Sequence, residues 1–174
     1  MISQKVQEAI NGQIQKEFYS AYLYLSMATY CESRSLKGFA NWLRVQYQEE
    51  TFHATKLLNY LIERGGKVRL AVIDAPPFEF ESIMDLFKKV LEHEQYITAS
   101  INKLYEVAVK EKDFAAQIFL QWYVNEQVEE EASVGEVLDK LEVIGEQTVD
   151  LLYLDKELAT RVFIPPVQDT TAGQ

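Results

Sequence analysis

The sequence predicts an all-α fold, a bundle of four long helices followed by a shorter fifth one. Apolar residues recur at steps of three and four along four long segments, which is the spacing of one helix face. Glycine and proline are scarce, seven and four in 174 residues, and three of the prolines lie near breaks in this pattern. With 48% hydrophobic residues, a chain of this length can bury a full core as one domain.

The first helix is expected over residues 3–33, with the Ser3 side chain as its N-terminal cap. Its apolar face is interrupted at Glu17, where the helical period calls for a hydrophobic residue. The link that follows, residues 34–35, is short. Two long helices joined by so short a link must lie antiparallel.

The second helix is expected over residues 36–64, capped by Ser35 and ended by the glycine pair 65–66. Glu50 and His53 interrupt the middle of its apolar face. Because they are one helical turn apart, they lie on the same face. A carboxylate in the centre of an apolar face is costly unless a positive group holds it. The pair is therefore a candidate for metal binding.

The third helix is expected over residues 82–111, after a connection that is too long for a tight hairpin. This connection, residues 67–80, contains two consecutive prolines and can run the length of the bundle when it is extended. We therefore expect a crossover that makes the second and third helices parallel. Ser82 and Asp85 form a capping pattern at the start of the third helix. Glu94 interrupts its apolar face.

The fourth helix is expected to follow its cap, Asp113, and to end before Gly145. Gln127 and Glu130 interrupt its apolar face. A fifth helix over residues 148–161 is too apolar to stay in water and too short to join the bundle as an equal. We therefore expect its apolar face to pack at a subunit interface.

The five helices are expected to form one domain, residues 1–163, before an extended or disordered tail, residues 164–174. The single cysteine, Cys31, excludes a disulfide framework or a four-cysteine metal site, and its expected role is that of a small buried hydrophobe. The chain starts without a charged-then-apolar leader, and no run approaches the length of a membrane span. We therefore expect a cytoplasmic protein.

The chain is acidic, with 27 Asp and Glu residues against 17 Lys and Arg residues and a net charge of −10. This balance argues against nucleic acid and anionic membranes as partners. It suits a protein that attracts cations. The same acidity is also expected of a solvated, solubilising surface, so charge alone does not decide between the two interpretations.

The residues that carry chemistry are acids placed once on each long helix. A single buried Glu is commonly a satisfied structural acid, but four uncompensated carboxylates in one core would repel each other or stay protonated. Two divalent cations would resolve this conflict, and oxygen ligands with one imidazole suit iron or manganese better than structural zinc. The set comprises Glu17, Glu50, Glu94 and Glu130, with His53 and Gln127 one turn from two of them.

The predicted dinuclear centre is asymmetric. Only the second helix carries a complete Glu-x-x-His motif, because the residue three positions after Glu130 is Ser133. One metal is therefore expected to have a histidine ligand. The other would be held mainly by carboxylates and more weakly, which favours metal that passes through.

These motifs, over most of the chain, resemble the bacterial and archaeal non-haem ferritins. The resemblance rests on residues 17–24, residues 49–54, Glu94 and residues 125–131, together with the crossover and the apolar fifth helix. It implies a ferritin-like bundle that assembles into a hollow homo-oligomeric shell of 24 subunits. It also implies a ferroxidase, which oxidises Fe(II) with O₂ or H₂O₂ at a dinuclear centre and stores Fe(III) as a mineral inside the shell.

The resemblance also assigns residues to the irons. Glu17, Glu50 and His53 would hold the first iron, and Glu50 would bridge to the second. Glu94 and Glu130 would complete the second iron, with Gln127 beside it. Tyr24 matches the family's site tyrosine, hydrogen-bonded to ligands and able to give one electron, although a core tyrosine is an equally good interpretation of Tyr24 alone. The expected catalytic residues are thus Tyr24, Glu50 and Glu130.

A third iron site, for transit between the centre and the cavity, is implied by Glu49, Glu126, Glu129 and Glu130. Spacing supports it, because Glu126 and Glu130 share a helix face and Glu129 lies one turn from Glu126. Without the resemblance, this cluster would be interpreted as a solvated helix face.

The sequence departs from related families at several positions. Thr51 stands where the haem-binding methionine of bacterioferritins would be, so no haem is expected. Gln117 and Leu120 stand where animal ferritins carry the acids of their three-fold channel, so the sequence leaves the entry channel for iron open. His93 points about 100° away from Glu94 and is expected at the surface.

Two other functions stay open at this point. A di-iron peroxidase or oxygenase acting on an outside substrate could use the same bundle, and a dimer in gel filtration would favour it. The missing second Glu-x-x-His motif and the apolar fifth helix argue against it. A storage or assembly subunit with a silent centre is the non-catalytic alternative. It would be favoured if Fe(II) produced no rise in absorbance.

Overall fold

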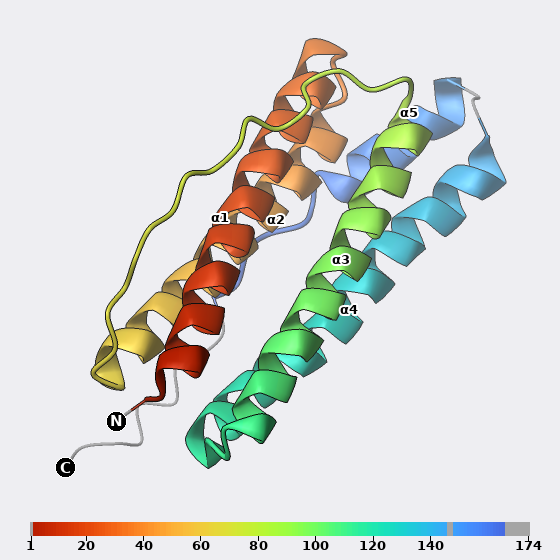
Figure 1. Cartoon of the computed structure of the whole chain (residues 1–174). Helices are drawn as coiled ribbons and strands as arrows, with labels where there is room; N and C mark the ends of the chain where they lie inside the picture. Colours follow the sequence, from red (N-terminus) through yellow and green to blue (C-terminus); the bar gives the residue numbers. More distant parts are fainter. Residues whose placement is uncertain (1, 146–147, 166–174) are drawn as a thin grey trace.

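The computed structural model describes residues 2–145 and 148–165, and five helices form that part of the chain. Among the described residues there is no β-strand, which confirms the predicted all-α class (Figure 1). The helices are α1 (Gln4–Ser33), α2 (Lys37–Glu63), α3 (Ile83–Lys110), α4 (Phe114–Ile144) and α5 (Thr148–Leu158).

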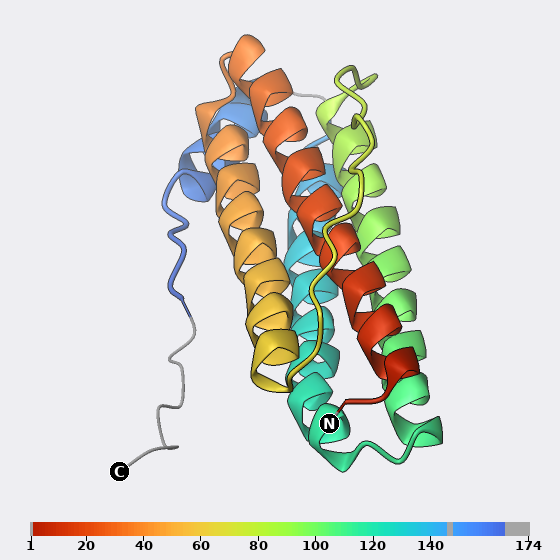
Figure 2. The ribbon, with the colours of Figure 1, turned by 60° about the vertical axis from the view of Figure 1, so that its left-hand side comes forward.

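The four long helices pack as two antiparallel pairs, α1 with α2 and α3 with α4 (Figure 1). The connection after α2 has no regular secondary structure and returns along α1 to the other end of the bundle, so α2 and α3 are parallel as predicted (Figures 1 and 2). The short helix α5 lies at the end of the bundle where α1 turns into α2 (Figure 2). None of the described helices is long and apolar enough to span a membrane.

Three of the predicted N-terminal caps are formed. The side chains of Ser3, Ser82 and Asp113 each accept a hydrogen bond from the backbone N–H three residues ahead, at 3.3, 3.0 and 3.0 Å. Such bonds satisfy backbone donors that have no partner inside the helix. The sequence therefore located the starts of α1, α3 and α4 correctly.

The predicted cap of α2 is wrong. Ser35 adopts a left-handed backbone conformation, with φ of 62°, and its side chain does not cap the helix. Instead, Asp155 Oδ1 from α5 accepts hydrogen bonds from the backbone N–H groups of Gly38 and Phe39, at 2.8 and 3.0 Å. Gly38 permits this approach, since a Cβ atom there would lie 1.5 Å from the Asp155 carbonyl oxygen. The cap comes from a residue more than a hundred positions away.

Helix α5 is also shorter than predicted, ending at Leu158 rather than at Arg161. The side-chain amide of Asn41, on α2, donates to the carbonyl oxygens of Leu158 and Arg161 at 3.2 and 2.9 Å. Leu154 and Leu158 are buried, whereas Tyr153 is exposed. One face of α5 thus packs inside its own subunit, and its place at a subunit interface stays a prediction.

The core consists of two apolar clusters, one near each end of the bundle, with the polar residues between them on every long helix. On α2, for example, Phe39 and Leu43 belong to one cluster and Leu57 and Leu61 to the other, with Glu50 between them. The fold therefore brings a buried polar layer to the middle of the bundle. Most of the predicted tail, residues 166–174, lies outside the described residues, and the boundary at residue 163 stays a prediction.

Candidate metal centre

The polar layer contains the acids that the sequence singled out, and all of them are buried. Each comes from a different long helix, and each replaces a hydrophobic residue between the two apolar clusters. The layer thus places ionisable groups where water is excluded, at a cost that something must compensate. Its buried members, all at most 5% exposed, are Glu17, Gln46, Glu50, His53, Glu94, Gln127 and Glu130.

The first group of potential ligands consists of Glu17, Glu50 and His53. One ligand atom from each lies within 4.8 Å of the other two. His53 Nδ1 is 3.6 Å from Glu50 Oε2, which is too long for a strong hydrogen bond. Within the described part of the chain, Glu17 Oε2 and both carboxylate oxygens of Glu50 are buried without a hydrogen-bond partner. These three oxygens are free to bind a cation.

A second group shares His53 with the first. Ligand atoms of His53, Glu126 and Glu130 also lie within 4.8 Å of one another. His53 Nε2 is 3.6 Å from Glu126 Oε1, so the two ring nitrogens face different carboxylates. The sequence assigned His53 to one iron only, and no spacing signal pointed to its second contact.

The remaining acid, Glu94, is held through both of its oxygens. The Tyr24 hydroxyl donates to Glu94 Oε1, and Gln127 Nε2 donates to Glu94 Oε2 at 3.2 Å. Gln127 also lies 3.3 Å from the Thr98 hydroxyl. The structure therefore brings Tyr24 and Gln127 to Glu94, and both orient its carboxylate. The sequence places Tyr24 on the face of Glu17 and Gln127 beside the second iron, without naming Glu94 as the partner of either.

Two further glutamines orient the carboxylates of Glu17 and Glu130. Gln13 Nε2 donates to Glu17 Oε1 at 2.9 Å, and Gln46 Nε2 donates to Glu130 Oε2 at 2.7 Å. Neither was predicted as a functional residue, although Gln46 lies on the apolar face of α2 and Gln13 lies one turn before Glu17. A polar amide one turn from a buried acid is the signal that could have found them. Neutral donors of this kind fix a carboxylate without cancelling its charge.

The electrostatics of the layer are dominated by burial, because these amide partners are neutral. Burial raises the pKa of Glu50 and of Glu94, and it raises the pKa of Glu130 to about 7, with the neighbouring Glu94 charge adding to the effect. Burial alone lowers the pKa of His53, but the facing carboxylates of Glu126 and Glu50 outweigh it and raise that pKa well above its ordinary value. Without metal, protons must therefore compensate the layer.

The acids predicted for the third site are placed less uniformly. Glu126 is half-buried in the group with His53 and Glu130, whereas Glu129 is exposed and belongs to neither group. Glu49 is half-buried and forms an ion pair with Arg161, with Nη2 2.8 Å from Oε2. Burial raises the pKa of Glu49 to about 7, against the opposing charge of Arg161.

His93, which the sequence places at the surface, is half-buried, because α1 packs against part of its ring. Its ring lies 5.9 Å from Tyr19 and 6.4 Å from Tyr24 between ring centroids, and its Nε2 is 2.8 Å from the Ser20 hydroxyl. Burial lowers the pKa of His93 to about 4, so the ring is neutral. The helical wheel placed His93 away from Glu94 correctly, but α1 covers that side of α3.

These residues form a buried, oxygen-rich set with one imidazole. Carboxylate oxygens that are desolvated and unpaired are the atoms a hard or borderline divalent cation prefers. The donor set therefore fits iron or manganese.

Comparison with known proteins gives a consistent result. The family model described as a ferritin-like domain matches residues 7–144. The chain is 40% identical over 163 residues to the bacterial non-heme ferritin of Staphylococcus aureus strain MRSA252, covering 94% of this chain and 98% of the relative. It is 41% identical over 163 residues to the protein of the same name from Staphylococcus haemolyticus, with the same coverage.

Solved structures agree with this match. An open-pore ferritin from the hyperthermophilic archaeon Archaeoglobus fulgidus superposes with a TM-score of 0.92 at 54% identity, over 93% of this chain and all of that chain. A closed form of the same ferritin, engineered by site-directed mutagenesis, superposes with a TM-score of 0.93 at 54% identity, over 94% of this chain and all of that chain.

Proposed function

The chain belongs to the ferritin-like family, and from this membership and its buried carboxylate layer we propose that it is an iron-storage ferritin with ferroxidase activity. The observation that carries the proposal is the set of three buried oxygens, on Glu17 and Glu50, that have no hydrogen-bond partner among the described residues. Such oxygens destabilise a protein unless a ligand uses them. Fe(II), the substrate, would be that ligand.

Two Fe(II) ions would share the layer. Glu17, Glu50 and His53 would hold the first, and Glu50 would bridge to the second, held by Glu94 and Glu130 with Gln127 beside it. Iron supplies the redox chemistry with O₂ or H₂O₂ as the oxidant. The protein supplies the ligands and a pocket from which bulk water is excluded.

The protein's own groups prepare this site. The glutamine amides and the Tyr24 hydroxyl fix the carboxylates of Glu17, Glu94 and Glu130 before iron arrives, so these three need little reorganisation on binding. The raised pKa of Glu130, about 7, means that the empty layer retains protons near neutral pH. Binding of Fe(II) would release them, because the ligating oxygens must be ionised.

Oxidised iron would leave towards the cavity through a third site at Glu49, Glu126, Glu129 and Glu130. The contact of His53 Nε2 with Glu126 supports this route, because it links the dinuclear pocket to the half-buried acids beside it. Glu129, which is exposed, would stand at the outer end of the route. No haem takes part in this proposal.

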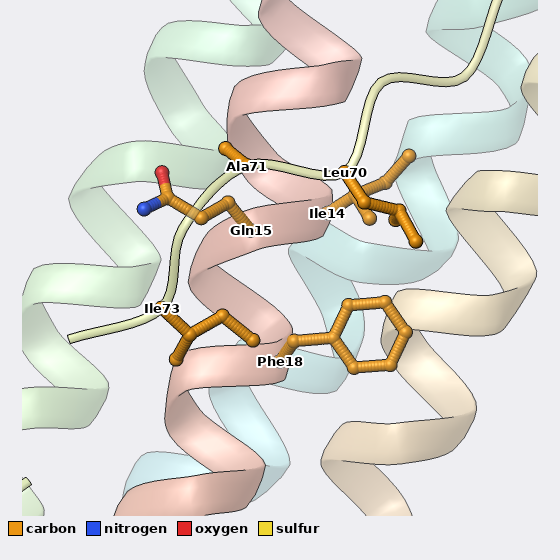
Figure 3. Close-up of a pocket in the computed structure, with 6 residues that line it drawn as sticks. All are labelled: Ile14, Gln15, Phe18, Leu70, Ala71 and Ile73. Carbon is orange, nitrogen blue, oxygen red and sulfur yellow. The ribbon is translucent and has the colours of Figure 1, made fainter. Parts of the chain in front are cut away.

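The proposal also includes assembly of the chain into a shell of 24 subunits. The crossover exposes apolar side chains, among them Leu70, Val72 and Phe78. Beneath it lies an apolar cavity of about 320 Å³ against α1, which self-association would help to cover (Figure 3). Its lining residues are Ile14, Gln15, Phe18, Leu70, Ala71 and Ile73. A cytoplasmic location is part of the same proposal.

The test combines oxidation with retention of iron. Fe(II) is added anaerobically to metal-free protein in excess of the dinuclear sites, and O₂ or H₂O₂ then follows while absorbance is recorded. We expect a rapid rise, and Fe(III) that co-elutes with a particle of several hundred kilodaltons in gel filtration. A dimer that oxidises an outside substrate would favour the peroxidase or oxygenase alternative. Protein without any Fe(II)-dependent rise would contradict the ferroxidase.

A further inference from the structure

Arg161 brings a fixed positive charge to the edge of the carboxylate layer. Its Nη2 donates to Glu49 Oε2 at 2.8 Å, and the two side chains are 23% and 21% exposed. Glu49 directly precedes Glu50, the proposed bridge between the two irons. The guanidinium therefore occupies a carboxylate that the proposed third iron site would use.

The position of Arg161 is set by contacts that do not involve Glu49. Asn41 holds the carbonyl oxygen of Arg161 at 2.9 Å, and Asp155 fixes α5 to the start of α2. The segment after α5 consequently runs beside α2 (Figure 2). The guanidinium also lies over the Trp42 ring, 4.5 Å from its centroid, where a cation–π contact stabilises it. Arg161 would thus stay in place if Glu49 turned away.

The ion pair between Arg161 and Glu49 has the geometry of one in which another cation can replace the guanidinium. It consists of a single N–O contact, and Nη1 of Arg161 is buried without a hydrogen-bond partner within the described residues. A single contact is weaker than the bidentate pairing that arginine can form with a carboxylate. Partly exposed ion pairs contribute little stability. A divalent cation, with twice the charge, can therefore displace the guanidinium from Glu49.

We propose that Arg161 is a displaceable counter-charge, which holds Glu49 while the third site is empty and releases it when Fe(II) arrives. This inference rests on the proposed function. It makes Arg161 a positioning residue that acts through Glu49. The competition weakens Fe(II) binding at the third site and so favours onward passage into the cavity, whereas the dinuclear pair meets no such competitor.

The test is an anaerobic calorimetric titration of the assembled, metal-free protein with Fe(II). Arg161→Gln should tighten the weak class of sites about fivefold, the change expected from losing a partly exposed ion pair. The dinuclear class should keep its affinity. Arg44→Gln is the matched control, because it also removes an arginine from a carboxylate pair, with Glu32 at 3.5 Å, on the exposed surface. It should change neither class.

Two further variants separate the charge from its structural setting. Arg161→Lys keeps the charge but not the planar stack on Trp42, and should bind Fe(II) like the wild type. In a Glu49→Gln background, Arg161→Gln should have no effect, because the carboxylate that it would release is gone. An effect that persists there would overturn the proposal, as would unchanged or weaker binding in Arg161→Gln alone.

A third readout needs no variant and remains available if Arg161→Gln does not assemble. Wild-type crystals soaked anaerobically in Fe(II) should show the Arg161 guanidinium away from Glu49, and unsoaked crystals should show the pair. A third-site iron with the pair intact would overturn the inference. A dinuclear iron pair with no third site would also overturn it, while leaving the ferroxidase proposal standing. Protein that binds no Fe(II) at all would contradict both the role of Arg161 and the proposed ferroxidase function.

Discussion

Two consecutive residues of α2, Glu49 and Glu50, belong to different electrostatic environments. Glu50 is fully buried, and neither of its oxygens has a partner among the described residues. Glu49, one step along the helix and so turned by about 100°, is one-fifth exposed and faces Arg161. His53 links the inner acids to the outer ones, since it lies in one group of potential ligands with Glu17 and Glu50 and in another with Glu126 and Glu130.

Under the proposed function, this difference would let one helix serve two kinds of metal site. The inner group consists of Glu17, Glu50, Glu94, Glu130 and His53. Neutral amides hold three of its four carboxylates and Glu50 has no hydrogen-bond partner among the described residues, so divalent cations are the natural compensation. The outer group consists of Glu49 and Glu126 together with the guanidinium of Arg161. Because this guanidinium already pairs with Glu49, a metal ion must compete for that carboxylate. We therefore expect the inner group to depend on metal for its stability, and the outer group to hold metal weakly.

The largest effect should follow from dismantling the inner group. Glu17→Ala together with Glu50→Ala removes two proposed ligands, one of which is the bridge, and the initial rate of Fe(II) oxidation should fall at least roughly 100-fold in stopped-flow absorbance. Glu8→Ala with Glu32→Ala removes two exposed acids of α1 and should leave the rate unchanged. An unchanged rate in the first double variant would remove the site assignment.

The pH dependence of the stability of the metal-free protein tests whether the inner carboxylates are held without a permanent positive charge. An acid whose pKa is higher in the folded protein destabilises the fold when it is ionised. For Glu130 this penalty is fully present above about pH 7 and fades as the pH falls towards the ordinary value of 4.5. The raised pKa of His53 acts in the same direction, because protonation favours the fold. The melting temperature of metal-free protein should thus rise by roughly 5 °C from pH 8 to pH 6.

Saturating Zn(II), a redox-inert probe, supplies the control for this pH experiment. The ligands must be ionised to bind it, so metal-loaded protein should become less stable as the pH falls over the same interval. Equal pH dependence with and without Zn(II) would mean that the inner carboxylates do not dominate the stability of the metal-free layer.

A smaller effect should come from the hydrogen bonds of Asp155, which hold α5, and with it the segment that carries Arg161, against α2. Asp155→Ala removes the acceptor for two backbone N–H groups of α2, and should cost about 1 kcal/mol in the free energy of unfolding measured with urea. Asp150→Ala, an exposed acid of the same helix, is the matched control and should cost little. If both variants lost the same amount, the long-range cap would contribute nothing specific.

The smallest effect is expected at Tyr24. Tyr24→Phe removes the hydroxyl that donates to Glu94, but Gln127 still holds the other oxygen of that carboxylate. The initial rate of Fe(II) oxidation should fall about fivefold, the worth of roughly one hydrogen bond. Tyr22→Phe, at a half-exposed position on the same helix, should not change it. A loss as large as that of the double glutamate variant would make Tyr24 indispensable rather than supporting.

The sequence predicted the inner group better than the outer one for a physical reason. Glu17, Glu50, Glu94 and Glu130 are visible because each breaks a helical apolar period, a signal local to its own helix. The pairing of Glu49 with Arg161 joins residues 112 positions apart, and no local pattern encodes it. The same limit explains why Ser35 was chosen as a cap and Asp155 was missed. The partial covering of His93 by α1 was missed for the same reason, because a helical wheel does not show which neighbouring helix covers a face.

The most direct test of the contrast between the two groups is an iron anomalous map from wild-type crystals soaked anaerobically in Fe(II). We predict two strong peaks in the inner group, on either side of Glu50, and a weaker third peak beside Glu49 and Glu126. Peak heights in the opposite order, or a strong outer peak with none at Glu50, would contradict the account.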